Sequence, residues 1–181
     1  MTPNLATDPG TEFLKQTLAT FKSQKSLGDK TFAQLGDEQF FLAPNAETNS
    51  IAVTIQHMAG NMRSRFTDFL TTDGEKPDRN RDGEFEAQPL TRAQLVEQWE
   101  AGWQVVFGTV GALTSADLLR TVYIRSEAHT VMQALIRQLS HYGYHVGQIV
   151  YAGKFLKDAG WKTLSIERGK SKDWRPPGLG K

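Results

Sequence analysis

Apolar side chains recur every three to four residues in four long segments of the chain. These segments cover about residues 11–28, 48–71, 91–112 and 127–158. Repetition at this interval places the apolar side chains on one face of an α-helix, which can then pack against neighbouring helices. Because the pattern predicts helices and little else, we expect an all-α fold in which four amphipathic helices form a bundle.

The second and third segments have clear helix signals. In the second, six apolar residues fall within one narrow arc of a helix: Ile51, Ile55, Met58, Met62, Phe66 and Phe69. In the third, Thr91 and Gln94 form a T-x-x-Q capping box, which predicts a helix start at this point. The positions of the third helix that are expected to face the core are Leu95, Trp99, Trp103 and Val106.

The remaining residues are predicted to connect the helices or to form the ends of a single domain over residues 1–181. Residues 1–10 contain two prolines and a glycine, which is typical of a loose leader, and residues 160–181 are expected to form an extended tail. Residues 113–126 form a connection in which TVYIR is expected to be extended. In the connection over residues 29–46, the apolar side chains expected to pack on the core are Phe32, Leu35, Phe40, Phe41 and Leu42.

The long connection over residues 72–89 is highly charged. Nine of the fourteen residues from Asp73 to Glu86 carry a charge, and long connections in compact domains are often functional. Residues 78–83 imitate the first half of a calcium-binding loop, but Pro89 stands where the bidentate glutamate is needed. We therefore expect a solvated cluster of paired charges rather than a calcium site.

Composition excludes several classes of function. The 181 residues include 21 lysines and arginines, 20 aspartates and glutamates, and no cysteine. A disulfide framework, a thiolate zinc site, an iron–sulfur cluster and cysteine catalysis are therefore excluded. The net charge of +1 gives no basic surface field for nucleic acid, and no apolar run reaches the length needed to span a membrane. We expect a cytoplasmic protein.

The four histidines are the main candidates for chemistry. His141 and His145 stand four residues apart in the fourth predicted helix, so both imidazoles can reach one ion. His57 lies beside the apolar stripe of the second helix and reaches the pair if these two helices are neighbours. Three neutral imidazoles then hold a divalent cation and leave a position for water or substrate. His129 falls on another face of the fourth predicted helix and is left out.

Three stretches resemble one branch of the DinB/YfiT-like superfamily, a branch known only as a domain of unknown function. They are SIAVTIQHMAGNMRSRFTDFLTTDGEKPDRNRDGEFE (50–86), RQLSHYGYHVGQIVYAGK (137–154) and SIERGKS (165–171). The resemblance implies a four-helix bundle with a long crossover. It also implies a zinc or nickel site with one histidine from the second helix and a His-x-x-x-His pair from the fourth. The matching residues are His57, His141 and His145.

Characterised members of this superfamily are thiol-dependent S-transferases or isomerases that use bacillithiol, mycothiol or glutathione. Others are known only by assignment as metal-dependent hydrolases, and many members are dimers. The resemblance therefore implies a transferase in which the ion activates a low-molecular-weight thiol for attack on a small-molecule substrate. A histidine-bound ion lowers the pKa of a coordinated thiol, which suits a chain without cysteine. Asn61 and Arg65, one and two turns after His57, are candidates for orienting the ligand.

Two alternatives stay open. In the first, the ion activates water for hydrolysis, with Asp68, Glu75 or another acidic residue of the charged loop as general base. In the second, the protein is a non-catalytic, stress-related bundle that binds metal or another ligand. For any of these functions, apolar area around Trp161 and Trp174 favours a homodimer.

Overall fold

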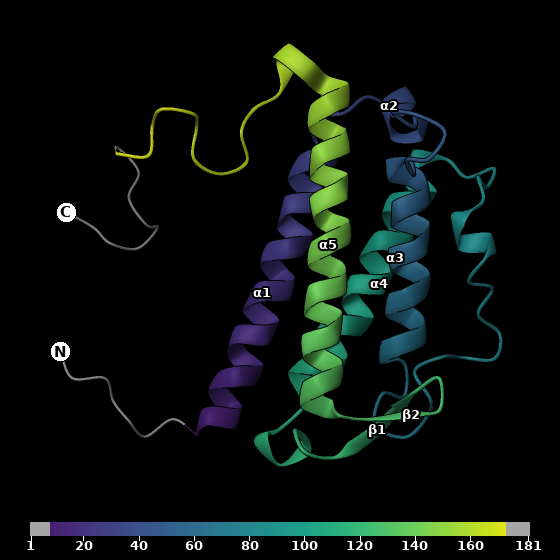
Figure 1. Cartoon of the computed structure of the whole chain (residues 1–181), viewed down its shortest axis with the longest axis vertical. Helices are drawn as coiled ribbons and strands as arrows, with labels where there is room; N and C mark the ends of the chain where they lie inside the picture. Colours follow the sequence, from purple (N-terminus) through teal and green to yellow (C-terminus); the bar gives the residue numbers. More distant parts are fainter. Residues whose placement is uncertain (1–7, 173–181) are drawn as a thin grey trace.

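The computed structural model describes residues 8–172 and is mostly helical, as the sequence predicted (Figure 1). The α-helices of this region are α1 (Pro9–Phe32), α2 (Asp37–Phe41), α3 (Ile51–Phe66), α4 (Arg92–Ala112) and α5 (Val131–Lys157). Its 3-10 turns are η1 (Gly83–Phe85), η2 (Ser115–Asp117) and η3 (Asp158–Gly160). Two strands, β1 (Thr121–Ile124) and β2 (Glu127–Thr130), pair as a small antiparallel hairpin.

The four long helices share one hydrophobic core. α1 packs beside α5 and α3 beside α4, while contacts of α1 with α4 and of α3 with α5 join the two pairs (Figure 1). Phe21 of α1 contacts one aromatic ring from each of the other three helices. Its ring centroid lies 6.2 Å from Phe66, 6.1 Å from Trp103 and 5.8 Å from Tyr142. This buried cluster holds α3 and α5 together, as a site between them requires.

Each long helix begins at a side chain that caps its first turn. Asp8, Ser50, Thr91 and Thr130 each accept a hydrogen bond from the backbone N–H three residues further along. Such a cap stabilises a helix by about 1 kcal/mol because it satisfies a donor that has no partner within the helix. The predicted capping box of Thr91 and Gln94 is confirmed.

α1 is longer at both ends than the sequence predicted. It begins at Pro9, within the predicted leader, because Asp8 caps it and proline is well tolerated at the first helical position. Residues 1–7 of that leader lie outside the described residues. At the other end, Gly28 does not terminate the helix. A Cβ at this position would lie 2.5 Å from the ring of Trp99, so the glycine allows α1 and α4 to approach closely.

The connection after α1 contains the short helix α2, which the sequence pattern did not predict. Phe32, Leu35 and Phe40 are buried, as expected. The expectation for Phe41 and Leu42 was wrong, because these side chains are 43% and 52% exposed. Only one face of a helix of this length can contact the core, and Phe40 occupies it.

α5 begins four residues later than predicted, because the residues before Val131 form β2. The extended segment at β1 is confirmed, but its partner strand was expected to be helix. The turn between the strands, at Arg125 and Ser126, has positive φ angles of 56° and 63°. Both backbone N–H groups donate to the carboxylate of Asp73, at 2.8 and 2.7 Å. The hairpin is thereby tied to the start of the charged connection.

After η3, residues 161–172 contain no helix or strand. The ring of Trp161 lies close to Gly153 of α5, and the backbone of Lys162 exchanges two hydrogen bonds with the side chain of Gln34. Trp174 lies outside the described residues, and the homodimer stays a prediction. In the part of the chain that is described, no helix is long and apolar enough to cross a membrane.

Candidate metal centre

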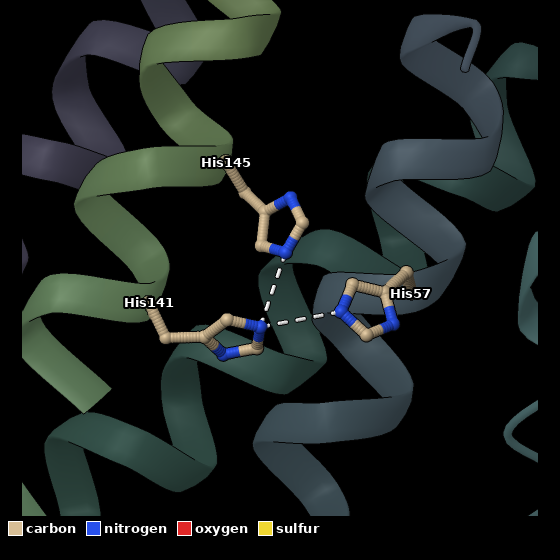
Figure 2. Close-up of side chains that lie close together, drawn as sticks. All are labelled: His57, His141 and His145. Carbon is tan, nitrogen blue, oxygen red and sulfur yellow. Dashed lines mark hydrogen bonds between the residues drawn. The ribbon is translucent and has the colours of Figure 1, made fainter. Parts of the chain in front are cut away.

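Three histidines face one another between α3 and α5 (Figure 2). His57 comes from α3, and His141 and His145 come from successive turns of α5. The Nε2 atom of His141 lies 3.3 Å from Nε2 of His57 and 3.1 Å from Nε2 of His145. The fold thus brings together the three residues that were predicted from the sequence as metal ligands.

The outer partners of two of these rings indicate which nitrogen carries the proton. Nδ1 of His57 lies 3.0 Å from Oε2 of Glu84, and an ionised carboxylate can only accept a hydrogen bond. Nδ1 of His145 lies 2.8 Å from the amide oxygen of Gln148, which also accepts. Nδ1 of both rings therefore donates outward, and in the neutral form of each ring Nε2 directs a lone pair inward. When all three rings are neutral, at most one proton, on His141, is left among the three converging Nε2 atoms.

This donor set fits a divalent cation. Two nitrogens bound to one ion at about 2.0–2.1 Å lie about 3.3 Å apart in tetrahedral geometry and about 2.9 Å apart in octahedral geometry. The observed separations of 3.3 and 3.1 Å fall within that range. One ring nitrogen of each histidine lies within 4.8 Å of the other two. Neutral imidazole is a good ligand for both zinc and nickel.

The surroundings keep two of the imidazoles neutral. Burial lowers the pKa of His141 to about 3, and the neighbouring rings of His145 and His57 add to this effect. Burial and the nearby His57 also lower the pKa of His145, although the hydrogen bond with Gln148 acts in the opposite direction. Neutral imidazole is the form that binds a metal, so His141 and His145 can act as ligands at pH 7 without first losing a proton.

Glu84 belongs to this site and was missed in the sequence. Besides contacting His57, its carboxylate accepts hydrogen bonds from Nε and Nη2 of Arg79, each at 2.7 Å. Burial opposes ionisation of Glu84, but the hydrogen bonds from His57 and Arg79 outweigh it and lower the pKa of the carboxyl group. The sequence signal here was the density of charge between residues 73 and 86, which does not distinguish Glu84 from its neighbours.

The charged connection between α3 and α4 packs along the outer face of α3 (Figure 1). Gln56 of α3 donates to the backbone carbonyl of Glu86, and Ser64 donates to that of Gly74. The side chain of Arg79 is only 4% exposed. The expectation of a solvated loop was therefore wrong at its centre, because the paired charges of this loop cover a polar face of α3.

Asn61 and Arg65, the candidates for orienting a ligand, are both buried and bonded within the protein. Oδ1 of Asn61 accepts hydrogen bonds from Gln138 and Tyr142 of α5, at 2.8 and 3.0 Å. Arg65 donates to a backbone carbonyl of the charged connection and, at 2.9 Å, to Glu75. These contacts join α3 to α5 and to the connection. A role in orienting a ligand stays a prediction for both residues.

The other residues considered for chemistry lie outside the histidine group. Among the described residues, the cluster of possible metal ligands consists of the three histidines alone, without Asp68 or Glu75. Glu75 is paired with Arg65 and with Arg125, each at 2.9 Å. His129 lies in β2 rather than on a helix, with Nε2 3.7 Å from its neighbour Glu127.

The fold and the site define a mostly helical protein with a possible metal centre between two helices. Residues 8–170 match the model of a family described as a protein of unknown function, DUF1572, and the chain therefore belongs to this family. A search of curated proteins found no match.

Proposed function

We propose that this protein is a metal-dependent transferase of the DinB-like type, in which His57, His141 and His145 hold a divalent cation, zinc or nickel. Its substrates are a low-molecular-weight thiol and a small electrophilic molecule. The observation that carries the proposal is the convergence of three Nε2 atoms, with hydrogen-bond acceptors at the outer nitrogens of His57 and His145.

The arrangement of the chain supports the DinB-like assignment. Four long helices surround one core, and a long connection separates α3 from α4. One histidine comes from α3, and the His-x-x-x-His pair comes from the last long helix. These are the features that the resemblance to the superfamily implies for a four-helix bundle with a long crossover.

A set of three protein ligands favours a catalytic role over a structural one. Structural zinc sites usually close with four protein ligands, whereas catalytic sites keep a position for water or substrate. Within residues 8–172, no aspartate, glutamate or fourth histidine joins the group. Glu84 lies near it, but its oxygens are engaged by His57 and Arg79.

The absence of cysteine favours a thiol that arrives as a second substrate. When bound, a divalent ion lowers the pKa of a thiol or a water molecule that it contacts, so that the nucleophile forms at neutral pH. The chain's part is to hold three imidazoles in a fixed arrangement with their Nε2 atoms converging. Burial of His141 and His145 favours the neutral form of these two rings, since it disfavours their protonation.

Hydrolysis is the second candidate, and the nearby carboxylates argue against it. A hydrolase of this kind needs a group that accepts a proton from the attacking water. Glu84 is paired with Arg79, and Glu75 is paired with Arg65 and Arg125. Burial raises the pKa of Glu75, but these guanidinium groups outweigh it and lower the pKa, as Arg79 and His57 do for Glu84. Both carboxylates are therefore weak bases.

Elemental analysis of purified, untagged protein tests the metal site first. We expect about one equivalent of zinc or nickel in the wild type and its loss in His57→Ala and His141→Ala. His129→Ala is the matched control, because it removes a histidine outside the group, and it should keep its metal. A wild type that contains no metal and takes none up on titration would contradict the proposal.

Activity assays then separate the three classes of function. The metal-loaded protein is mixed with a chromogenic electrophile and with bacillithiol, mycothiol or glutathione in turn. Turnover that needs both thiol and metal supports the transferase. Metal-dependent ester hydrolysis without thiol would favour the hydrolase. A metal-binding protein with neither activity, whose stability falls by several kcal/mol on metal removal, would be the non-catalytic bundle.

A further inference from the structure

The carboxylate of Glu84 is held in one position beside His57. Oε2 accepts hydrogen bonds from Nδ1 of His57 at 3.0 Å and from Nη2 of Arg79 at 2.7 Å. Oε1 accepts one from Nε of Arg79, also at 2.7 Å. The Glu84 side chain is 10% exposed. Arg79 also reaches Glu75, at 3.4 Å, which anchors it within the connection. Glu84 therefore cannot turn away from His57 without separating a largely buried ion pair.

Gly60 provides the space that this carboxylate occupies. It stands three residues after His57 and therefore lies close to it on the surface of α3. A Cβ at residue 60 would lie 2.2 Å from Oε1 and 2.7 Å from Cδ of Glu84. A glycine inside a helix costs about 1 kcal/mol relative to alanine. Here it lets a side chain from the connection lie flat against α3 and reach the imidazole of His57.

The contact with Glu84 determines the chemical form of His57. A carboxylate at Nδ1 keeps the proton on that nitrogen and leaves a lone pair on Nε2, which faces His141. If the proton moved to Nε2, it would point into the histidine group and exclude a cation. The ring of Phe85 packs against the imidazole of His57, with centroids 4.5 Å apart, and limits its rotation.

We propose that Glu84 is a positioning residue of the metal centre, which holds His57 in the orientation and in the Nδ1-protonated form that bind the ion. Gly60 leaves space for its carboxylate, and Arg79 holds the carboxylate by hydrogen bonds. This inference rests on the proposed metal site and deepens it. The centre then includes the connection between α3 and α4 as well as three residues on two helices.

Titration with Co²⁺ alone, followed by visible absorption, tests this role in two independent variants. Glu84→Gln removes the charge, and Gly60→Ala displaces the carboxylate without altering it. We expect both to raise the Kd for Co²⁺ by about 10- to 100-fold, as loss of an outer partner of a metal-binding histidine usually does. The double variant should lose no more than the single variants, because both changes act through one contact.

Two matched controls accompany these variants. Glu86→Gln makes the same change at an exposed residue of the same connection, and Gly108→Ala makes the same change in α4, where a Cβ would contact nothing within 4 Å. Both should bind Co²⁺ as the wild type does. Urea unfolding of the metal-free proteins shows whether any variant has simply lost its fold.

Imidazole ¹⁵N chemical shifts of the metal-free protein give a readout that a purely structural role would not change. We expect the His57 proton on Nδ1 in the wild type. In Glu84→Gln, the amide nitrogen can donate to Nδ1, and a population with the proton on Nε2 should appear. A His57 ring whose proton stays entirely on Nδ1 in this variant would contradict control of the ring by Glu84.

The outcomes separate this inference from the proposed function. If wild type binds Co²⁺, His141→Ala does not, and both Glu84→Gln and Gly60→Ala bind as tightly as wild type, then the metal site stands and the positioning role is overturned. An equal loss in Gly108→Ala would assign the effect of Gly60→Ala to the helix rather than to Glu84. Absence of Co²⁺ binding in the wild type would overturn both proposals.

Discussion

Two imidazoles of the proposed metal centre differ in the hydrogen-bond partners of their outer nitrogens. His57 donates to the carboxylate of Glu84, whereas His145 donates to the neutral amide of Gln148. A carboxylate raises the basicity of a ligand histidine more than an amide does, because it stabilises positive charge on the ring. At the scale of single residues, a carboxylate in place of the Gln148 amide is therefore expected to make His145 a stronger ligand.

Gln148→Glu is expected to tighten metal binding. Because residue 148 is exposed, part of the new charge will be screened by solvent, and we expect a gain of about two- to fivefold in affinity. A competition titration with Zn²⁺ and a chromophoric chelator measures it. Gln104→Glu, at an exposed position of α4, adds the same charge away from the centre and should leave the affinity unchanged. Weaker binding in Gln148→Glu would show that the amide oxygen is not a simple acceptor from His145.

A site residue could be predicted from the sequence when its position relative to the other site residues depends only on nearby chain. His141 and His145 are one helical turn apart, so helix geometry alone places them together. His57 required the further inference that α3 and α5 are neighbours. Glu84 could not be found, because it lies 27 residues from His57 in a segment without periodicity. Its position depends on the glycine at residue 60, whose role appears only in three dimensions.

At the scale of elements, the capping-box pattern predicts two helix starts, of which only the one at Thr91 was used in the sequence analysis. The T-x-x-Q pattern at Thr91 and Gln94 recurs at Thr130 and Gln133, and both are capping boxes in the structure. The second box marks the start of α5 and would have excluded residues 127–130 from it. The strand formed by these residues was not predictable from its own pattern, since its pairing depends on β1 and on the turn that Asp73 holds.

Glu75 joins three elements, and its removal should weaken the attachment of the charged connection. Arg65 of α3, Arg79 of the connection and Arg125 of the hairpin all lie within ion-pair distance of it. We expect Glu75→Gln to lower the free energy of unfolding at pH 7 by about 1–3 kcal/mol, since each remaining guanidinium loses a charged acceptor. Urea unfolding measures this difference.

The effect of Glu75→Gln should depend on pH with a definite sign. Burial raises the pKa of Glu75, but the hydrogen bonds from Arg65 and Arg125 outweigh it and lower the pKa below the ordinary value of 4.5. The unfolded chain therefore binds a proton before the native protein does, and the stabilisation by Glu75 is lost as pH falls. Wild type and variant should differ by a constant amount above about pH 5 and converge below pH 4.5.

Glu97→Gln is the control for this experiment, because residue 97 is exposed on α4 and should affect stability little at any pH. A difference between wild type and Glu75→Gln that persists unchanged down to pH 3 would contradict an ionic contribution of Glu75. The effect would then come from packing of the side chain, which does not titrate.

At the scale of the whole molecule, a metal ion in this centre would link two distant parts of the chain. His57 and His141 are 84 residues apart in sequence, so their nitrogens meet only when α3 and α5 are packed together. An ion bound by all three histidines therefore binds the native state and not the unfolded chain. By mass action it stabilises the fold by about 1.4 kcal/mol for each tenfold rise in free metal above the Kd.

Removal of the metal by a chelator is expected to lower stability without unfolding the protein. The aromatic cluster around Phe21 draws on all four long helices and is fully buried without help from the site. Far-ultraviolet circular dichroism of the chelated protein should therefore match that of the loaded protein. Urea unfolding at a series of free Zn²⁺ concentrations should show stabilisation in the wild type and none in His57→Ala. If chelation instead abolished the helical signal of the wild type, the ion would be a structural element, and the three-ligand centre would no longer support an enzyme.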